Sequence, residues 1–529
     1  MFFPFGLRRV HKLVLCHSPY LRVLAVAVCF ISGCGPSPDS RESIITKADE
    51  NNLRIGVIGF NSQDPLYGFQ HVSRSLSVEG LLGNSRDGRP RPRLAESWTV
   101  SPDGLQWTIK LRADAKFQDG TSLDAEAVKH SLDESLANTS DRSLQPGLQD
   151  IVGIDVAGSG EIVIRLRHRS TFLLDDLSMP ISKRGEAGEQ IGTGPFVTTS
   201  GSSEQIVMSS FRNHYRGVPQ IQQIVWKPYP TLRTAWAGMM RGEIDFLYEV
   251  GQDAVEFVEG ESSVSTFAFL RPYVIGVIFN SHREPLKNPV IRKALNFAVN
   301  RQLIVDQALR GQGIVAHTPI WPLHWAYDQT VPGYTYDPAR ASAILDTIGK
   351  IPVTDSSSFV GPARLRFTCL LPENFSVFER MALLVQKELF EIGVDMRLEV
   401  VPFREFNERI VRGDFDALFL EIIGGFSVSR PYVFWHSKSP RNSFGYQDVD
   451  VDEALDAIRQ APDDETYRAT VAQLQRNLIA DPPAIFLAWG KTSRAVSRRF
   501  QVPNEPDSDV FLTVGRWRTG LGSNEETNP

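Results

Sequence analysis

His317 and His324 lie close to Trp321 and Trp325 in the sequence, and they are the side chains whose types and spacing come nearest to a metal site. Imidazole nitrogens bind transition metals, but a protein site usually needs three or four ligands. No carboxylate or cysteine completes a recognisable set beside these histidines. Polar loop histidines are the ordinary explanation, so we expect no metal site.

Catalytic motifs are missing from the sequence. It contains no G-x-S-x-G, H-E-x-x-H, C-x-x-C or Walker pattern. Residues 311–316 fit a degenerate G-x-G-x-x-A, but they follow a predicted helix, whereas a dinucleotide site requires a preceding strand. Cys369 lies in the apolar run 365–371 and is expected to be a buried structural thiol. We therefore expect no enzyme activity and no cofactor, with a hydrolase on an unfamiliar scaffold as the least favoured alternative.

Cys34 and the residues before it indicate the cellular location of the protein. The cysteine follows the apolar run 23–31 and the small residues Ser32 and Gly33, and the segment before that run carries basic side chains and no acid. This pattern predicts a secretory signal peptide over residues 1–33, and the apolar run is far shorter than the about 20 residues of a membrane-spanning helix. The residues Ile-Ser-Gly-Cys resemble the lipobox of bacterial lipoproteins, which implies acylation of Cys34 after cleavage before it. An ordinary cleaved signal is the alternative, and either way the protein is exported.

Composition limits the remaining possibilities. The formal net charge is −6, and removal of the basic signal segment makes the mature chain more acidic, which argues against nucleic acid as a partner. A chain of 529 residues usually divides into two or three domains. Of the four cysteines, only Cys369 remains once the signal segment is removed and Cys34 is acylated, so no intrachain disulfide is expected.

The first part of the chain mixes strands and helices. Strands are predicted at 53–58 and 107–112, and a helix is predicted to begin at the capping-box pattern of residues 121–124. Residues 151–156 and 162–166 predict a hairpin around Gly158 and Gly160. This order lacks the strict strand–helix alternation of a purely parallel α/β domain.

Two distant segments repeat one small plan. A helix from Thr231 ends at Arg241-Gly242 and leads into a strand at 246–248, and a helix around 406–410 ends at Arg412-Gly413 and leads into a strand at 417–420. In each, the glycine suits the left-handed conformation that commonly ends a helix. The repetition predicts two lobes, although a short echo of this kind also arises by chance.

The second lobe is predicted to begin after Arg271. A strand at 273–279 precedes a helix that starts with Asn288 as N-cap and Pro289 as first residue, and that ends near Gly311. A further helix at 378–389 leads into an alternating strand at 394–400, as a mostly parallel sheet requires. Beyond about residue 490, strand-like pieces that include 510–514 predict a return to the first lobe.

The chain resembles the family 5 extracellular solute-binding proteins, which are the oligopeptide, dipeptide and nickel receptors of ATP-driven importers. The resemblance spans about residues 53–518 and implies an α/β, two-lobed, periplasmic-binding-protein-like clamshell (cluster C type) with an extra subdomain inserted in the first lobe. The stretches that carry it are Leu94-Ala-Glu-Ser-Trp98 through Phe117-Gln-Asp-Gly120 and Ala125-Glu-Ala-Val128, then Gly192-Thr-Gly-Pro-Phe196, then Phe279-Asn280 through residues 290–298 to Arg301, and Tyr336-Asp-Pro-Ala339. The implied boundaries are 1–33 signal peptide, 34–52 flexible tether, 53–75 plus 191–271 plus 490–518 lobe I, 76–190 inserted subdomain, 272–489 lobe II, and 519–529 polar tail.

This resemblance implies a substrate-binding lipoprotein of an ABC importer. Such a protein captures a peptide or another small polar solute between its lobes and delivers it to a permease, and it acts by closing about a hinge. The implied partners are the ligand, the permease complex and a lipid anchor, and the protein is expected to be a monomer at the cell envelope, facing the periplasm or the exterior. A sensor or chaperone that uses the same clamshell is the alternative.

The ligand pattern departs from that of the dipeptide and oligopeptide receptors. Those relatives carry an aspartate for the peptide amino group where this chain has Gly424 or Gly425, and an arginine for the carboxylate where residues 371–375 have none. Loss of one partner of a buried ion pair costs several kcal/mol, which disfavours a free-amine dipeptide. Arg430 instead suggests an anionic or neutral polar solute, although an ordinary surface arginine also explains it.

Family position suggests which side chains line the cleft. They are aromatic or basic residues on the hinge crossings and on the loops that end the strands, where flat rings give contact area and tyrosine or tryptophan adds a polar group. Each is equally compatible with a place in a lobe core. The candidates are Tyr67, Tyr273, Phe426, Arg430, Tyr432 and Trp489.

Overall fold

The computed structural model describes residues 51–58, 72–138, 143–202, 204–348, 363–503, 505 and 508–520. The predicted signal peptide, Cys34, nearly all of the tether, Tyr67 and the tail beyond Gly520 lie outside these ranges. Within them, no helix has both the length and the apolar character needed to cross a membrane. The described residues all belong to one compact unit.

An 11-stranded sheet organises this unit, in the order β12-β13-β14-β1-β15-β21-β16-β20-β18-β19, with β17 paired to β21. The predicted first strand and the alternating strand after Gly393 are both part of it. Its strands are β1 (Asn52–Ile58), β12 (Phe196–Gly201), β13 (Ile206–Ser210), β14 (Gln223–Tyr229), β15 (Phe246–Val250), β16 (Val264–Phe279), β17 (Gly313–Val315), β18 (Leu365–Pro372), β19 (Val394–Val401), β20 (Ala417–Ile423) and β21 (Ala484–Ser497).

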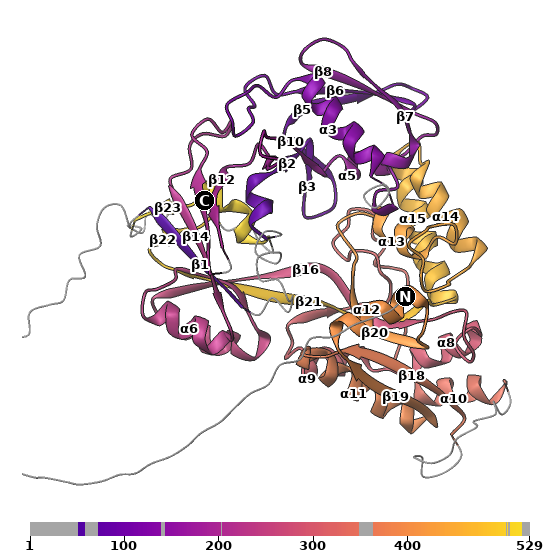
Figure 1. Ribbon diagram of the computed structural model, residues 1–529. Coiled ribbons are helices and arrows are strands. Elements are labelled where there is room, and N and C mark those ends of the chain that lie inside the picture. The colour runs from indigo at the N-terminus through magenta and orange to yellow at the C-terminus, as the bar shows by residue number, and fades with distance from the viewer. Residues whose placement is uncertain are drawn as a thin grey trace, which may run out of the picture. The chain divides into compact units, whose positions relative to one another are not determined.

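Two long strands, β16 and β21, join the two halves of the sheet (Figure 1). The first part of β16, up to Leu270, pairs with the end of β21 beside β15, and the part from Val274 pairs with the start of β21 beside β20. The register shifts between Leu270 and Val274. Pro272 lies in this interval and has no N–H to donate to a sheet, which suits it to an irregular position.

The sheet is mixed, so the expectation of a mostly parallel sheet was wrong. Parallel pairs occur at β1 with β14 and β15, and at β18 with β19 and β20. The joining strands β16 and β21 are antiparallel to each other and to their neighbours β20 and β15. The alternation of helix and strand in the sequence predicted the parallel units, but it did not predict the antiparallel pairing of the strands that connect them.

Both predicted helix–strand units are confirmed. Helix α6 (Leu232–Met240) is capped by Thr231, and Gly242 has a φ of 70° before β15. Helix α12 (Phe403–Arg412) ends at Gly413, which has a φ of 66° before β20. One unit lies in each half of the sheet, on either side of β16 and β21.

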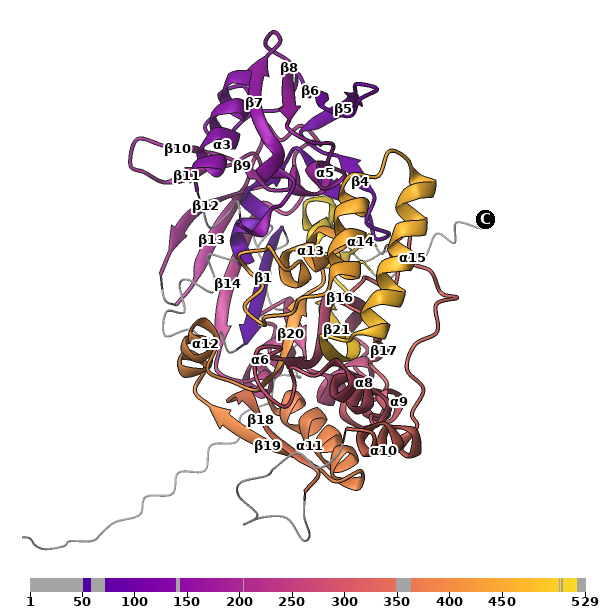
Figure 2. The same ribbon diagram turned by 90° about the vertical axis from the view of Figure 1, so that its right-hand side faces the viewer.

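Helices cover both faces of the second half of the sheet. Ile275, Val277 and Phe279 face one core, and Val274 and Ile278 face the other, as the period of a strand requires. The first core packs against α8 (Pro289–Phe297), α9 (Arg301–Ala308), α10 (Pro338–Asp346) and α11 (Ser376–Glu391), and the second against α13 (Ser429–Trp435), α14 (Val449–Arg459) and α15 (Asp464–Ala480). Helices α14 and α15 lie side by side (Figures 1 and 2).

The predicted helix from Pro289 to about Gly311 is divided in two. Asn288 caps α8 as expected, and its side chain accepts a hydrogen bond from the Val290 N–H. The chain then leaves the helix, and Asn300 begins α9 by accepting from the Leu303 N–H. The apolar period continues across this break, so periodicity alone did not reveal it.

Residues 79–191 contain a separate small sheet, β5 (Ala95–Val100), β6 (Gln106–Leu111), β8 (Glu161–Leu166) and β7 (Ile151–Val156). It packs against α3 (Ala125–Ala137), and the predicted β7–β8 hairpin is confirmed. Helix α3 begins later than predicted, because Asp124 accepts a 2.9 Å hydrogen bond from the Ala127 N–H, while Thr121 bonds to Asp119. A hairpin of β3 (Leu82–Asn84) and β4 (Pro90–Pro92) and the short helix α5 (Phe172–Asp176) also belong to this region.

Residues 510–514 are not a strand, contrary to prediction. They belong to a 3₁₀-helix, Val510–Arg516, in which Asp509 accepts a hydrogen bond from the Phe511 N–H. Val510, Phe511 and Val514 are buried while Leu512 is 61% exposed, which is a helical burial pattern. The chain instead returns to the first half of the sheet through β21 itself.

Candidate ligand-binding site

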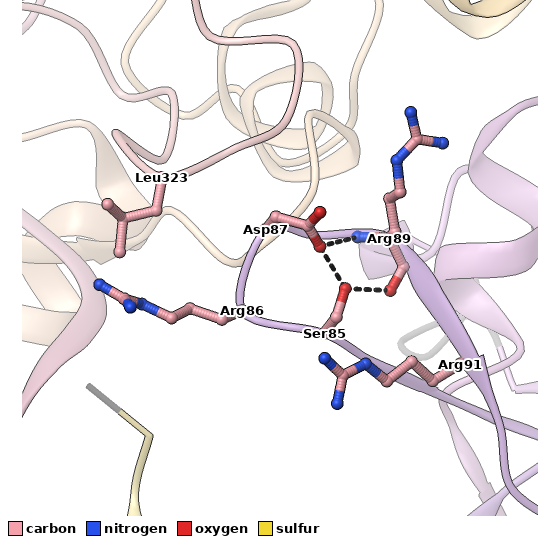
Figure 3. Close-up of a pocket in the computed structure, with 6 residues that line it drawn as sticks. All are labelled: Ser85, Arg86, Asp87, Arg89, Arg91 and Leu323. Carbon is pink, nitrogen blue, oxygen red and sulfur yellow. Dashed lines mark hydrogen bonds between the residues drawn. The ribbon is translucent and has the colours of Figure 1, made fainter. Parts of the chain in front are cut away.

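The tip of the β3–β4 hairpin forms a tight turn (Figure 3). The Ser85 hydroxyl contacts the Asp87 carboxylate, and the Arg89 N–H donates to the same carboxylate at 3.2 Å. Gly88 has a φ of 84°, a left-handed conformation that glycine adopts without strain. Burial by itself raises the pKa of Asp87, but these hydrogen bonds outweigh it and hold the pKa below its usual value. Asp87 is thus an ionised organiser of the turn.

This tip contacts loops that follow the second half of the sheet. The Trp321 indole N–H donates to the Arg86 carbonyl at 2.8 Å, and the Trp325 backbone N–H donates to the Asp87 carbonyl at 3.0 Å. The approach is so close at Gly88 that a Cβ atom there would lie 2.1 Å from the Phe426 carbonyl oxygen. The hairpin therefore joins the small-sheet region to the second half of the molecule.

A cavity of about 540 Å³ lies beside the tip, lined by Ser85, Arg86, Asp87, Arg89, Arg91 and Leu323. Figure 3 shows the Arg86 side chain extending past the hairpin tip and the Arg91 guanidinium below Ser85, while Arg89 points away from both. Arg89 forms an ion pair with Asp464 at 2.7 Å and lies over the Trp325 ring. Three arginines against one acid make this wall cationic, and a guanidinium group can hold a carboxylate through two parallel hydrogen bonds. The volume suits a small solute.

Two of the predicted site residues meet the hairpin region. Trp489 is only 1% exposed, and Trp321 packs edge-on against it with ring centroids 5.2 Å apart. Phe426 also packs edge-on against Trp321, with ring centroids 5.2 Å apart. Trp321 thus links both predicted residues to the Arg86 carbonyl.

Arg430 and Tyr432 lie together at another contact with the small-sheet region. Both are on α13, and Arg430 donates to the Leu144 carbonyl at 2.6 Å. The Tyr432 ring packs edge-on against Phe172, and its hydroxyl accepts a 2.8 Å hydrogen bond from Arg459. These two side chains hold the two regions together in this arrangement.

Tyr273 is placed apart from the others, and Tyr67 lies outside the described residues. The period of β16 puts Tyr273 on the α11 side of the sheet, opposite to Val274, which pairs with Trp489. Its ring lies 4.8 Å from the Arg271 guanidinium, which forms an ion pair with Glu421 at 2.8 Å. Burial raises the pKa of Glu421, and Arg271 opposes this shift. Glu421 is thus engaged by Arg271, on the face of the sheet away from the hairpin.

The glycine at position 424 has a steric cause. A Cβ atom there would lie 2.2 Å from the Trp489 ring, so the close packing of Trp489 excludes a side chain. Gly425 has a φ of 63°, and a Cβ on it would meet the Arg430 side chain at 2.7 Å. The aspartate expected of the dipeptide receptors is therefore incompatible with this packing at either position.

The other chemistry-bearing residues are placed as follows. Burial lowers the pKa of His317 and of His324 to about 4, so both rings are neutral at pH 7. Within the ranges given above, no group of three His, Cys, Asp or Glu side chains could hold a metal ion. The 311–316 segment leads from α9 into β17, and Cys369 is fully buried, as predicted, which raises its pKa.

Arg86 and Arg91 were not predicted as site residues. They flank the sequence Asp-Gly, which is a strong hairpin signal between short strands. That signal predicts the turn but not the surface that it contacts, because the contact depends on residues more than 200 positions away, such as Trp321.

Comparison with known proteins assigns the family. Residues 89–444 match the model of the bacterial extracellular solute-binding proteins, family 5. The glutathione-binding protein GsiB of Salmonella paratyphi A is 27% identical over 356 residues, covering 64% of this chain and 67% of that protein. The oligopeptide-binding protein AppA of Bacillus subtilis is 24% identical over 538 residues, covering 94% and 97%.

A solved structure shows the same fold. NikZ from Campylobacter jejuni, in complex with Ni(L-His), superimposes with a TM-score of 0.75 at 22% identity, covering 88% of this chain and 99% of that one. The fold is the two-lobed α/β clamshell of periplasmic binding proteins. The chain belongs to the family 5 bacterial extracellular solute-binding proteins, whose members bind solutes rather than catalyse reactions.

Proposed function

We propose that this protein captures a small anionic, peptide-like solute in the cavity beside the β3–β4 hairpin and delivers it to an ABC importer. The observation that carries this proposal is that Arg86 and Arg91 both line a cavity of about 540 Å³, with Arg89 as a third arginine. Asp87, the acid in the lining, is held by the turn itself. Relatives that bind glutathione and oligopeptides support the peptide-like class.

Closure about β16 and β21 is the proposed mechanism, with lobe boundaries near residues 271 and 490 and the inserted subdomain at 76–190. The register shift between Leu270 and Val274 supports the first boundary. A ligand favours the closed form by its differential contacts, and a change from 1:99 to 99:1 needs about 5.5 kcal/mol. Hairpin residues 85–89 then complete the ligand cavity only when the lobes meet.

The proposed ligand is not a simple dipeptide that is held by its amino group. Gly424 and Gly425 leave no room for the aspartate that would pair with that group. A carboxylate held by Arg86 or Arg91 provides the main charge contact instead, and such charge-assisted hydrogen bonds are about twice as strong as neutral ones. Arg430, which donates to the Leu144 carbonyl, serves closure in this proposal rather than ligand binding.

Attachment to the membrane through acylated Cys34 is also part of the proposal, with the protein acting as a monomer at the cell envelope. The lipobox-like residues before Cys34 support it. Cys34→Ser is expected to move the exported protein from the membrane fraction to the soluble fraction, and an unchanged membrane fraction would contradict the anchor.

Native mass spectrometry of the freshly purified protein tests solute capture, because a bound ligand adds its mass to the protein. Calorimetry then compares glutathione with the uncharged dipeptide amide Gly-Gly-NH₂ blocked at its amino group. We expect glutathione to bind and Arg86→Ala and Arg91→Ala each to weaken binding about tenfold or more. Arg404→Ala is the matched control, since this arginine is 84% exposed on α12.

Two outcomes contradict the proposal. Equal binding of charged and uncharged peptides would show that Arg86 and Arg91 do not select for a ligand carboxylate. A protein that co-purifies without ligand and binds none of a panel of acidic peptides would favour the alternative sensor or chaperone role, which a search for unfolded-protein binding would then address.

A further inference from the structure

A second cavity, of about 420 Å³, lies on the other side of the β3–β4 hairpin. Aromatic side chains form much of its wall, with Trp98 and Trp107 from the small sheet and Trp325 and Tyr467 from the second half of the molecule. The cavity is thus built from both regions that the hairpin joins.

The small sheet presents the aromatic wall through its register. Trp98 pairs with Ile109 and Val100 pairs with Trp107, so these four side chains share one face. Helix α3 covers this face at Ile109, which is fully buried, whereas Val100 is 44% exposed. The uncovered end of an otherwise buried sheet face therefore opens onto the cavity.

Two acids in the lining, Asp175 and Asp463, have no cationic partner at ion-pair distance among the described residues. Asp175, on α5, accepts a hydrogen bond from the Ser427 hydroxyl, and no Lys, Arg or His nitrogen of the described chain lies within 4.0 Å of its carboxylate. Asp176, Arg430 and Tyr467 are the other titratable groups that act on it. Burial raises the pKa of Asp175 to about 7, with Ser427 and Arg430 opposing the shift.

The other charged groups of the lining form one ion pair and two hydrogen bonds with the backbone. Arg89 pairs with Asp464, and Arg169 donates to the Pro102 carbonyl at 3.0 Å. Asp463 caps α15 by accepting a 2.8 Å hydrogen bond from the Thr466 N–H. His324 is neutral, because burial lowers its pKa to about 4. Asp463 is thus engaged by its helix cap, and Asp175, which is partly buried, is the lining carboxylate that can face a bound cation.

We propose that this cavity is a second binding site, which takes a small organic ammonium cation between the indole rings of Trp98 and Trp107 and the carboxylate of Asp175. Indole faces attract cations, and the attraction is greatest where the cation is desolvated. The same wall already holds one cation in this way, since the Arg89 guanidinium lies 4.0 Å from the centre of the Trp325 ring. A carboxylate without a counter-ion adds the charge contact.

Occupation of this site favours closure. Its walls come from the small-sheet region and from the α14–α15 part of the second half, so a bound cation makes its full set of contacts only when the two are together. By linkage, the cation and the solute of the main cavity then raise each other's affinity. This effect does not depend on the chemical class of that solute.

Choline and its neutral isostere 3,3-dimethylbutan-1-ol provide the test, because they share a shape and differ in charge. Saturation-transfer NMR and calorimetry on the full mature protein measure binding of each. We expect choline to bind at least about tenfold more tightly than the isostere. Acidification from pH 8 to pH 5.5 is expected to weaken choline binding, since Asp175 takes up a proton as the pH falls through about 7.

Variants locate the site. Asp175→Asn and Trp107→Leu are each expected to weaken choline binding about tenfold or more, and thermal melting confirms that each variant is folded. Asp155→Asn and Trp236→Leu are the matched controls, because Asp155 pairs with Arg165 on the surface and Trp236 packs on Phe257 far along the chain.

Three results would overturn the proposal. The first is equal binding of choline and the isostere, which would make the cavity a neutral apolar site. The second is choline binding that survives both Asp175→Asn and Trp107→Leu. The third is no saturation transfer to choline at millimolar concentration.

Discussion

Substitution of Gly88 by alanine tests whether the hairpin tip controls closure. In the arrangement described here, a Cβ atom on Gly88 would lie 2.1 Å from the Phe426 carbonyl oxygen and 2.8 Å from the His324 ring. Both contacts are with the second half of the molecule, so they exist only when the hairpin is docked. The cost of a left-handed alanine, by contrast, is present in the open and the closed forms alike and cancels between them.

The size of the effect follows from these distances. A carbon atom 2.1 Å from an oxygen must move by more than about 1 Å to reach an ordinary contact, and this movement separates Trp321 from the Arg86 carbonyl and Trp325 from the Asp87 carbonyl. Each lost hydrogen bond contributes about 1 kcal/mol net, and more where a buried group stays unpaired. We expect Gly88→Ala to disfavour closure by about 2–3 kcal/mol, or about 30- to 160-fold in the closing equilibrium.

Single-molecule fluorescence transfer measures this equilibrium directly. Dyes attached at Val152→Cys and Arg404→Cys report the separation of the small sheet from α12, since both positions are exposed. Cys34→Ser removes the reactive thiol, and Cys369 is fully buried. Without ligand, Gly88→Ala is expected to show a lower population at high transfer efficiency than the parent protein.

Gly120→Ala is the matched control for this experiment. Gly120 also has a positive φ, of 88°, and a Cβ atom there has nothing within 4 Å, so this variant carries the same backbone cost without the clash. If Gly88→Ala and Gly120→Ala change the closed population equally, the steric argument is refuted and the hairpin tip does not set closure.

Two further predictions concern buried ion pairs. Arg459→Met leaves Asp150 buried without its 2.7 Å partner, so the closed form is expected to be destabilised by about 3 kcal/mol. The same fluorescence assay measures this effect, and an unchanged closed population would contradict a role of the pair in closure. Asp245→Asn removes a carboxylate held by Arg54 and Arg499, and urea unfolding at pH 7 is expected to show a loss of about 2–3 kcal/mol. Burial by itself raises the pKa of Asp245 but the two arginines hold it below its usual value, so the advantage of the parent protein is full above about pH 5 and vanishes as the pH falls through that lowered pKa. A difference that persists at pH 2 would show that packing, rather than charge, explains it.

Local structure could be predicted where a short pattern fixes the backbone by itself. The glycines after α6 and α12 and the Asn288 cap are examples, because the left-handed conformation and the cap hydrogen bond each involve only a few neighbouring residues. The amphipathic helix α11 and the alternating strand β19 also follow from one period each. These elements reproduce the parallel units of the sheet.

The strands that connect these units could not be predicted in the same way. Strand β16 extends nine residues before the predicted start at Tyr273, through a segment with no clear alternation. Its partner is β21, more than 200 residues away, so the pairing that forms this strand is invisible to a local pattern. Residues 510–514 illustrate the reverse case, where an apolar run typical of a strand is made helical by the Asp509 cap and by burial of one side.

The candidate site was predicted in part for the same reason. Phe426 lies beside Gly88 and Trp489 is linked to the hairpin through Trp321. The side of the sheet on which Tyr273 lies depends on the register shift at Pro272, which no sequence period reveals. Arg86 and Arg91 were not predicted as site residues, because the position of a hairpin tip relative to other parts of the chain cannot be read from its local sequence. The missing aspartate was noted in the sequence, and the packing of Gly424 on Trp489 now gives it a cause.

Contacts across the molecule fall into two groups with different consequences for closure. Arg310 and Arg380, on the second half, both pair with Asp253, which follows β15 close to the joining strands. A pair close to a hinge moves little during rotation about it, so we expect these contacts to persist in the open form. The contacts of the small-sheet region, at Gly88 and Arg459, lie outside β16 and β21, so the proposed rotation about these strands is expected to separate them. If the proposed closure holds, we expect changes in residues 79–191 to alter the closing equilibrium and the proposed ligand cavity together, without altering the pairing of β16 with β21.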